Sequence, residues 1–205
     1  TSYYVGGSHA FIAMSESVLK DIDVFDKNKP RALHPHPLFD NFGPKVTKEN
    51  ACGLLGLAPK LKYVLFFGFI REYKGLDLLM KAVDLLGDEL SDVRVLIAGE
   101  FYDNEKIYKD LEAELSIQDR LIWHNNFIAD EDVGKYFGVA DLVVQPYKTA
   151  TQSGVTQIAY HFERPILVTN VGGLAEIVPH GKVGYVTSKE PKNIADSIVD
   201  FYNNH

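Results

Sequence analysis

The stretch Gln145–Val178, QPYKTATQSGVTQIAYHFERPILVTNVGGLAEIV, decides how the chain is interpreted. It follows an apolar run, Leu142–Val144, and contains a second one, Ile166–Val168, with a helix-like segment, Thr156–Phe162, between them. Polar residues and glycine are concentrated after each apolar run. Ligands of open parallel sheets bind beyond the carboxyl ends of the strands. The stretch therefore predicts strand, loop, helix, strand and loop, and it favours a binding site with an anion at the start of the helix.

The same alternation extends over most of the chain. The predicted strands are 63–67, 93–98, 121–123, 142–144, 166–168 and 183–186, and the predicted helices are 47–57, 75–86, 105–115, 130–137, 156–162 and a final one from Pro191. The strands are continuously apolar, as expected where both faces of a sheet are covered. This alternation predicts an α/β fold with a doubly wound parallel sheet.

The front of the chain has a different organisation. Residues 1–34 are predicted to form an N-terminal extension, with no regular structure over 1–7, a helix over about 16–24 and a short strand over 31–33. Three prolines and a glycine over 35–46 exclude a regular element there. We therefore expect a linker at 35–46 and a separate domain at 47–205. The linker region contains His34 and His36, but no third ligand lies nearby, so no metal site is predicted.

Composition limits the classes of function. The net charge of −7 over 205 residues argues against a broad nucleic-acid-binding face, because phosphate backbones select basic surfaces. No apolar run approaches the roughly 20 residues of a membrane helix, and no signal peptide is visible. Cys52 is the only cysteine, a pattern that fits a reducing cytosol. Because the chain begins at Thr1 rather than Met, we expect a processed chain or a piece of a longer one.

The loop after the first strand of the predicted sheet carries candidate anion ligands. Gly68 lets a ligand approach the backbone closely, Arg71 can grip a phosphate with two hydrogen bonds, and Lys74 adds a point charge. The alternative is a solvated helix start. A dinucleotide-binding loop would read G-x-G-x-x-G here, but Ile70 and Tyr73 occupy its second and third glycine positions, which disfavours a nicotinamide or flavin cofactor.

A second candidate lies at Ser153, Gly154 and Val155, where the amides of a helix start favour a phosphate. The alternative is an ordinary serine cap. Further on, Gly172-Gly173 forms either a ligand-binding loop or a plain turn. Glu176 then either accepts hydrogen bonds from sugar hydroxyls or simply lies in the first turn of a helix, where the helix dipole favours an acid.

Several motifs in this order resemble the donor-binding domain of glycosyltransferase family 4, whose members are retaining enzymes with the GT-B fold. They are FFGFIREYKGLDLL, VRVLIAGE, ADLVVQPY with SGV after it, and RPILVTNVGGLAEIV, and the resemblance covers about 47–203. FIAMSESVLKDI and HPHPLFDNFG resemble the end of the family's N-terminal domain and the interdomain linker. The fold it implies is one Rossmann-like half of a GT-B architecture.

The resemblance implies transfer of a sugar from a nucleotide-sugar, with UDP or GDP as the leaving group, to a glycan or lipid-linked acceptor, without a required metal or cofactor. Charge builds on the diphosphate as the glycosidic bond breaks, so fixed cations lower the barrier. Carried over by position, Arg71 and Lys74 bind that diphosphate together with the amides at 153–155. Asn126, Phe127 and Ile128 lie where the base is usually held, and Glu176 matches the acid after the family's Gly-Gly.

Two departures from the family pattern concern the donor site. The common pattern has two glutamates eight positions apart, but Ala150 and Ile158 occupy those positions here. By hypothesis, Gln152, Ser153 and Glu176 substitute for them. The second departure is Phe69, which stands where many members have arginine, and by hypothesis Arg71, two positions on, takes the role of that arginine.

The resemblance also implies that most of an N-terminal acceptor domain is missing. We expect this chain alone to bind a donor weakly and to contain no catalytic residue. Features that dock the full enzyme on a membrane would lie largely in the missing half, and the expected location is the cytoplasm, including the inner face of the membrane. The competing functions are a non-catalytic nucleotide or sugar-phosphate binding module and, less favoured, a dinucleotide oxidoreductase.

Overall fold

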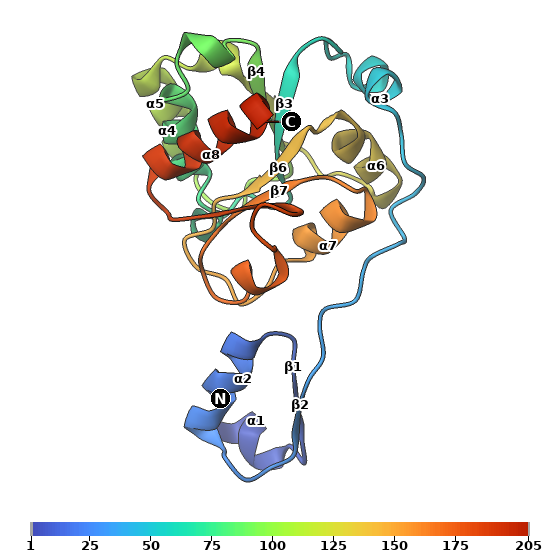
Figure 1. Cartoon of the computed structure of the whole chain (residues 1–205), viewed down its shortest axis with the longest axis vertical. Helices are drawn as coiled ribbons and strands as arrows, with labels where there is room; N and C mark the ends of the chain where they lie inside the picture. The colour runs from blue at the N-terminus through green and yellow to red at the C-terminus, as the bar shows by residue number, and fades with distance from the viewer. Residues whose placement is uncertain (1, 205) are drawn as a thin grey trace.

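The computed structural model describes residues 2–204 and contains one six-stranded sheet, flanked by helices and joined through an extended linker to a small N-terminal unit (Figure 1). Every neighbouring pair of strands in this sheet is parallel, and the strand order is β5-β4-β3-β6-β7-β8. The strands are β3 (Lys62–Phe67), β4 (Val93–Ala98), β5 (Leu121–His124), β6 (Leu142–Gln145), β7 (Ile166–Thr169) and β8 (Gly184–Thr187). The predicted doubly wound parallel sheet is confirmed.

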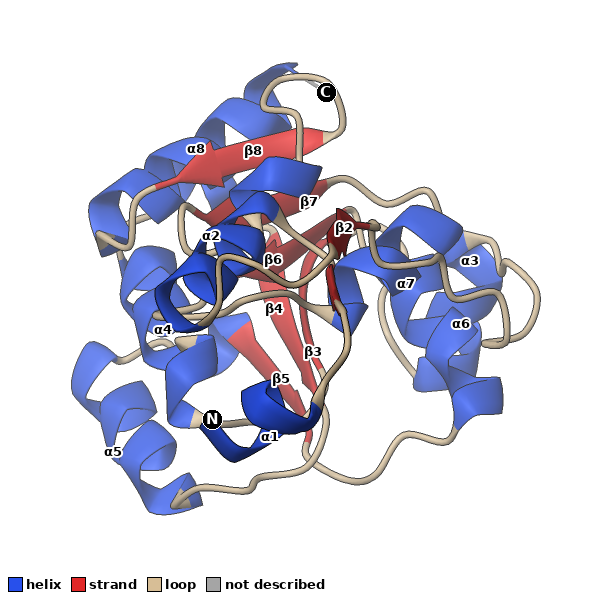
Figure 2. Cartoon of the chain, turned by 90° about the horizontal axis from the view of Figure 1, so that it is seen from below, coloured by secondary structure: helices blue, strands red, loops and turns tan. Residues whose placement is uncertain are grey.

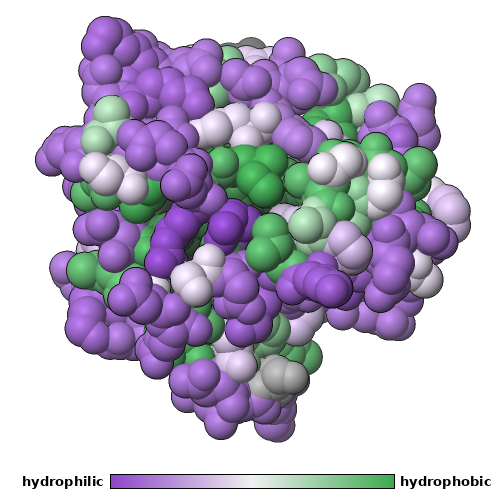
Figure 3. Space-filling model, turned by 90° about the horizontal axis from the view of Figure 1, so that it is seen from above, coloured by the Kyte–Doolittle hydropathy of each residue, from purple (hydrophilic) through white to green (hydrophobic). Residues whose placement is uncertain are grey.

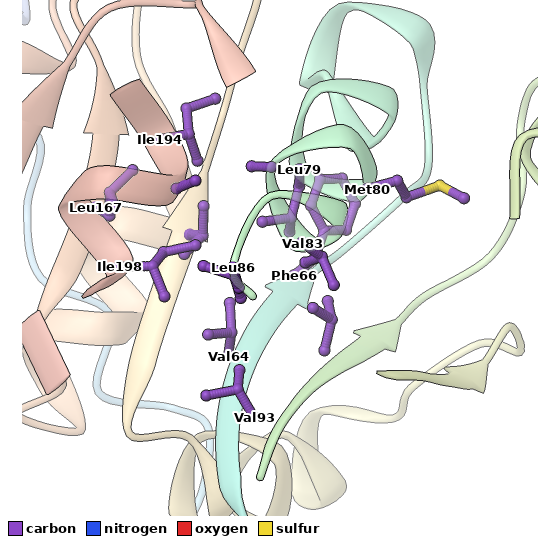
Figure 4. Packing of buried hydrophobic residues seen from close by; sticks show 14 of the residues in the cluster. Val64, Phe66, Leu79, Met80, Val83, Leu86, Val93, Leu167, Ile194 and Ile198 are labelled. Atoms are coloured by element: carbon purple, nitrogen blue, oxygen red, sulfur yellow. The ribbon is translucent and has the colours of Figure 1, made fainter. Parts of the chain in front are cut away.

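Two layers of helices cover the sheet, and Figure 2 shows them on opposite sides of it. One layer contains α4 (Leu76–Asp84), α5 (Glu105–Leu115) and α8 (Pro191–Asn204); the other contains α3 (Lys48–Leu55), α6 (Asp130–Val139) and α7 (Gly154–His161). Alternate residues of β3 face different layers: Val64 and Phe66 join the core with α4 and α8, whereas Tyr63 and Leu65 join the core with α3, α6 and α7. Figure 4 shows the first of these cores.

The predicted elements of this domain lie where the sequence placed them, with small shifts at their ends. The bounds of β4 and α5 are those predicted. By contrast, α7 begins two residues earlier than expected, at Gly154, because the Ser153 side chain caps it. The helix α6 begins at Asp130, as predicted, although its cap position is Ala129, which has no capping side chain.

The N-terminal unit comprises α1 (Ser2–Gly7), β1 (Phe11–Ala13), α2 (Glu16–Phe25) and β2 (Arg31–Leu33), with β1 and β2 parallel. The expectation of no regular structure over 1–7 is wrong for 2–7, and Thr1 lies outside the described residues. Contacts from outside the segment support α1: the Lys29 ammonium and the Ser8 hydroxyl donate to the carbonyl oxygens of Val5 and Tyr4. Such contacts at the end of a helix satisfy carbonyls that lack a partner within it.

No helix or strand lies between β2 and α3. The end of this linker is nevertheless seated on α6, where two glycines leave room for it. A Cβ at Gly134 would lie 2.9 Å from the Pro44 carbonyl oxygen, and one at Gly138 would lie 2.8 Å from that of Val46. Earlier in the linker, the Phe39 ring lies 3.1 Å from where a Gly154 Cβ would stand. The linker therefore passes directly over the start of α7.

The surface of the molecule seen from above is mostly hydrophilic, with apolar side chains gathered near its centre (Figure 3). This is the face opposite to the N-terminal unit, which lies below the sheet in Figure 1.

Candidate donor site

A cavity of about 360 Å³ lies at the carboxyl ends of β3, β4 and β6, where an open parallel sheet binds its ligands. Its lining residues come from the loops after these strands, from the starts of α6 and α7, and from the linker. They are Phe42, Phe67, Gly68, Phe69, Tyr73, Lys74, Gly99, Glu100, Phe127, Ile128, Asp130, Val133, Tyr147, Gln152, Ser153, Gly154, Val155 and Ile158. The cavity brings together seven of the ten predicted site residues.

Lys74 is the buried cation of the cavity. It ends the short 3₁₀ helix η1 (Glu72–Lys74) and is 8% exposed. The ion pairs formed within residues 2–204 do not include it. Burial, with a smaller contribution from the charge of Arg71, lowers the pKa of Lys74 from 10.5 to about 8. A buried ammonium without a carboxylate is costly, and a bound anion would offset that cost.

Gly68 makes room for this ammonium. Its φ of +89° lies in the left-handed region, and a Cβ there would stand 3.0 Å from the Lys74 Nζ. Any other residue would be strained at this φ and would press on the cation. The absence of a side chain at Gly68 thus leaves space for the Lys74 ammonium at the end of β3.

The start of α7 supplies the second polar group of the cavity. The Ser153 Oγ accepts a hydrogen bond from the Val155 amide at 3.2 Å and forms another with the Tyr147 hydroxyl, also at 3.2 Å. Burial raises the pKa of Tyr147, so that hydroxyl stays protonated. Because the Val155 amide is already engaged, Val155 cannot also donate to an anion in this geometry. The amides of Ser153 and Gly154 remain as the predicted anion donors.

Much of the cavity lining is apolar. Phe127, which is 64% exposed, and Ile128 line it as predicted, together with Val133 and the linker residue Phe42. Asn126 does not line the cavity; its side-chain nitrogen donates to the Phe127 carbonyl at 3.0 Å. The cavity lining therefore combines one buried cation with several aromatic side chains and two carboxylates, Glu100 and Asp130.

Two predicted or candidate cations point elsewhere. The exposed Arg71 guanidinium lies over the Tyr102 ring, 4.9 Å from its centroid, and does not line the cavity. Lys148 forms an ion pair with Asp77, at 2.9 Å. Of Arg71, Lys74 and Lys148, only Lys74 lines the cavity. Contact of Arg71 with a diphosphate stays a prediction.

Glu176 has a different partner from the predicted one. Its two carboxylate oxygens accept hydrogen bonds from the backbone amides of Glu16, at 2.7 Å, and Ser17, at 2.9 Å. Glu176 does not line the cavity. A sugar hydroxyl would have to compete with these amides, and contact between Glu176 and the donor stays a prediction.

Sequence reasoning did not place Phe42 or Tyr73 in the site, because nothing in a linker or a helix start marks an aromatic residue as a ligand contact. Gln152 was considered only as a substitute for the absent glutamates. The structure puts it in the cavity lining, and both polar atoms of its side chain are buried without a hydrogen-bond partner. Such a group is normally satisfied, so Gln152 is a candidate for contact with a polar ligand after a change of rotamer.

A second cavity, of about 480 Å³, is larger. It lies at the other ends of β7 and β8, with Pro165, Gly184 and Tyr185 among its lining residues. None of the predicted site residues lies there, and ligands of parallel sheets bind at the carboxyl ends. We therefore assign the donor site to the smaller cavity.

Residues 61–204 match the family model described as Glycosyl transferases group 1. The chain belongs to the group 1 glycosyltransferases. It is 28% identical to D-inositol 3-phosphate glycosyltransferase of Streptomyces scabiei over 185 residues, or 86% of this chain and 41% of that protein. It is 29% identical to spore coat protein SA of Bacillus subtilis over 174 residues, or 80% of this chain and 45% of that protein. The chain spans less than half the length of these two relatives.

Among solved structures, HepE of Anabaena in complex with UDP superposes with a TM-score of 0.83 at 20% identity, over 96% of this chain and 55% of that one. At this level of identity the likeness shows the fold alone. Together with the six-stranded parallel sheet, it establishes a Rossmann-like half of a group 1, GT-B glycosyltransferase.

The described part of the chain lacks a membrane-spanning helix and a cluster of metal-ligating side chains. None of its helices is long and apolar enough to cross a membrane. No three His, Cys, Asp or Glu side chains between residues 2 and 204 gather where they could hold a metal ion.

Proposed function

We propose that this chain is the donor-binding half of a retaining glycosyltransferase that transfers a sugar from a nucleotide-sugar to a glycan or lipid-linked acceptor. One observation carries the proposal: the buried ammonium of Lys74 lies at the carboxyl edge of the sheet and forms no ion pair with any residue from 2 to 204. The family supports it, and the relative HepE was solved with UDP.

The cationic and the aromatic residues of the lining fit the two parts of a nucleoside diphosphate. The diphosphate lies against Lys74 and the amides of Ser153 and Gly154, and the base lies between Phe127, Ile128 and Phe42. As the glycosidic bond breaks, negative charge grows on the diphosphate, and a fixed, desolvated cation stabilises this charge more strongly than water does. With a pKa of about 8, Lys74 is mostly protonated at pH 7 and is ready for this role.

The proposal includes a cytoplasmic location, on the inner face of the membrane where the full enzyme docks there, and no required metal. It also includes an acceptor-binding domain that the family supplies beyond this chain. The family resemblance supports all of these parts. The single cysteine, Cys52, which is buried and free, supports only the cytoplasmic location.

A second function, a non-catalytic binding module for a nucleotide or sugar phosphate, is favoured by one observation. Ile158, at a position where the family carries a glutamate, lines the cavity with an apolar side chain. Turnover by the full-length protein with a matched donor would exclude this second function.

Calorimetric titration of UDP, GDP, ADP and NAD into this chain tests donor binding. We expect saturable binding of UDP or GDP. Lys74→Met should weaken it about tenfold or more, because a hydrogen bond to a charged group is worth roughly 1.5–3 kcal/mol. The control is Lys148→Met, which removes a lysine outside the cavity lining and should leave the affinity nearly unchanged. Binding of NAD alone, or equal effects of the two variants, would contradict the proposal.

A further inference from the structure

The N-terminus of α2 is completed by a carboxylate from the sheet domain. The first amides of a helix have no partner within it. The Ser15 Oγ accepts a hydrogen bond from the Val18 amide, at 3.3 Å, and Glu176 accepts those of Glu16 and Ser17. Hydrogen bonds to an ionised group are roughly twice as strong as neutral ones, and the helix dipole adds to them. One glutamate thus binds two residues that lie about 160 positions away in the sequence.

Close packing accompanies these hydrogen bonds. Ser15 is 2% exposed, although it belongs to the N-terminal unit. A Cβ at Gly173 would lie 2.6 Å from the Ser15 Cβ and 2.5 Å from the Thr151 carbonyl oxygen. Gly173 is therefore held between the start of α2 and the loop after β6. We call Ser15, Glu16, Ser17, Gly173 and Glu176 the docking contact.

The docking contact adjoins the donor cavity. The Gly173 amide donates to the Thr151 carbonyl at 3.1 Å. Thr151 is followed directly by Gln152, Ser153 and Gly154, which line the cavity. Displacement of Gly173 would therefore remove a support of the loop that carries the anion-binding amides.

The N-terminal unit has few other attachments. No residue of α2 is fully buried, and its extensive contacts are with β1 and β2 of the same unit. Figure 1 shows this unit below the sheet domain, connected to it through the extended linker. We therefore expect the docking contact to determine the position of the N-terminal unit on the sheet domain.

We propose that Glu176 is a positioning residue: it docks the N-terminal unit onto the loops at 150–154 and 172–176, and docking sets the shape of the donor cavity. The link to nucleotide affinity rests on the proposed function. Coupling between two sites is reciprocal, so a nucleotide that binds the docked form more tightly also strengthens docking by the same factor.

Hydrogen exchange at the Glu16 and Ser17 amides, measured by NMR on this whole chain, tests docking. Glu176→Gln keeps the size of the side chain but leaves a single acceptor oxygen for two amides. We expect exchange at these amides to accelerate about tenfold or more in Glu176→Gln. Glu176→Asp keeps the charge and should restore part of the protection. Glu114→Gln, an exposed glutamate on α5, is the matched control and should change nothing.

Titration of UDP and GDP into the same variants tests coupling. In the wild type, the bound nucleotide should slow exchange at Glu16 and Ser17. Glu176→Gln should weaken the nucleotide by about fivefold or more, within the usual range for coupled sites, and should abolish its effect on exchange.

Each result decides one part. Equal exchange in Glu176→Gln and Glu114→Gln would overturn docking through Glu176. Faster exchange with unchanged nucleotide affinity would overturn the coupling and leave donor binding intact. If neither nucleotide binds the wild type, the proposed function and the coupling both fail, while exchange at the two amides still decides docking.

Discussion

The sheet domain and the N-terminal unit use the same kinds of element with very different burial. In the sheet domain, the four middle residues of the central strand β3 are buried between two layers of helices. In the N-terminal unit, Ile12 of β1 is 72% exposed and Val24 of α2 is 79% exposed. A two-stranded sheet is marginal in water, and parallel strands are normally covered on both faces. The sheet domain therefore stabilises itself, whereas the N-terminal unit depends on what it contacts.

The largest expected effect separates the two regions by a matched pair of substitutions. Phe66→Ala, at a side chain that is 1% exposed, should lower the free energy of unfolding by about 3–5 kcal/mol. Phe25→Ala, at a side chain that is 55% exposed, should change it by about 0.5 kcal/mol or less. Denaturant unfolding followed by circular dichroism measures both. Similar losses would show that the apolar face of the N-terminal unit is covered in solution.

In the sheet domain, the buried charge of Lys74 lowers the stability of the fold. Since the pKa of this lysine falls from 10.5 to about 8 on folding, the unfolded chain binds its proton more tightly. The charge therefore destabilises the ligand-free fold below pH 8, and the cost disappears as the pH rises from 8 to 10.5.

Consequently Lys74→Met should be more stable than the wild type at pH 7, and its advantage should shrink by up to roughly 3 kcal/mol at pH 10.5. Urea unfolding of the two proteins across this range measures the difference, in which all other titrations cancel. A difference that is constant with pH would show that Lys74 is not desolvated.

A third pair of variants probes the boundary between the regions. A Cβ at Gly173 would meet backbone and Ser15 atoms at 2.5 to 2.6 Å, so Gly173→Ala should cost about 1–3 kcal/mol. Gly53→Ala, in α3 with nothing within 4 Å of the new Cβ, should stabilise the protein by about 0.4–1 kcal/mol. Thermal unfolding distinguishes them, and equal shifts would mean that Ser15 is not packed against Gly173 in solution.

The smallest effect on stability is expected at the exposed strand. Ile12→Lys should change the free energy of unfolding by about 0.5 kcal/mol or less but should reduce self-association, because charges on short exposed strands block pairing between molecules. Sedimentation at several concentrations tests this. Unchanged association would remove β1 as a contact between copies.

The sequence predicted the sheet domain well because its signals are local and strong. The run 93–98 is apolar at almost every position, and a strand buried on both faces needs that pattern. The site was predicted in part. Gly68, Lys74 and Ser153 follow strands, and chain topology brings such residues to one edge. The helix at 2–7 could not be predicted, since the contacts that support its end come from Lys29 and Ser8 outside it.

The remaining differences between the predicted and the observed site arise from contacts between distant parts of the chain. Nothing in the spacing of Glu176 distinguishes a sugar hydroxyl from the amides of α2 as its partner, because α2 lies about 160 residues away. The same holds for Phe42, which reaches the cavity because glycines on α6 seat the linker behind it. Likewise, nothing in the spacing of Arg71 shows that its guanidinium lies over the Tyr102 ring.

The contacts of Pro44 and Val46 with α6 shorten the tether that joins the N-terminal unit to the sheet domain. Since that end of the linker is fixed and the Phe39 ring lies against Gly154, the part of the linker that can move is the part before Phe39. A short tether keeps its two ends at an effective concentration of the order of millimolar. Contacts too weak to hold two separate molecules together would then suffice within this chain. After each release, the N-terminal unit would meet the sheet domain again before another molecule could take its place.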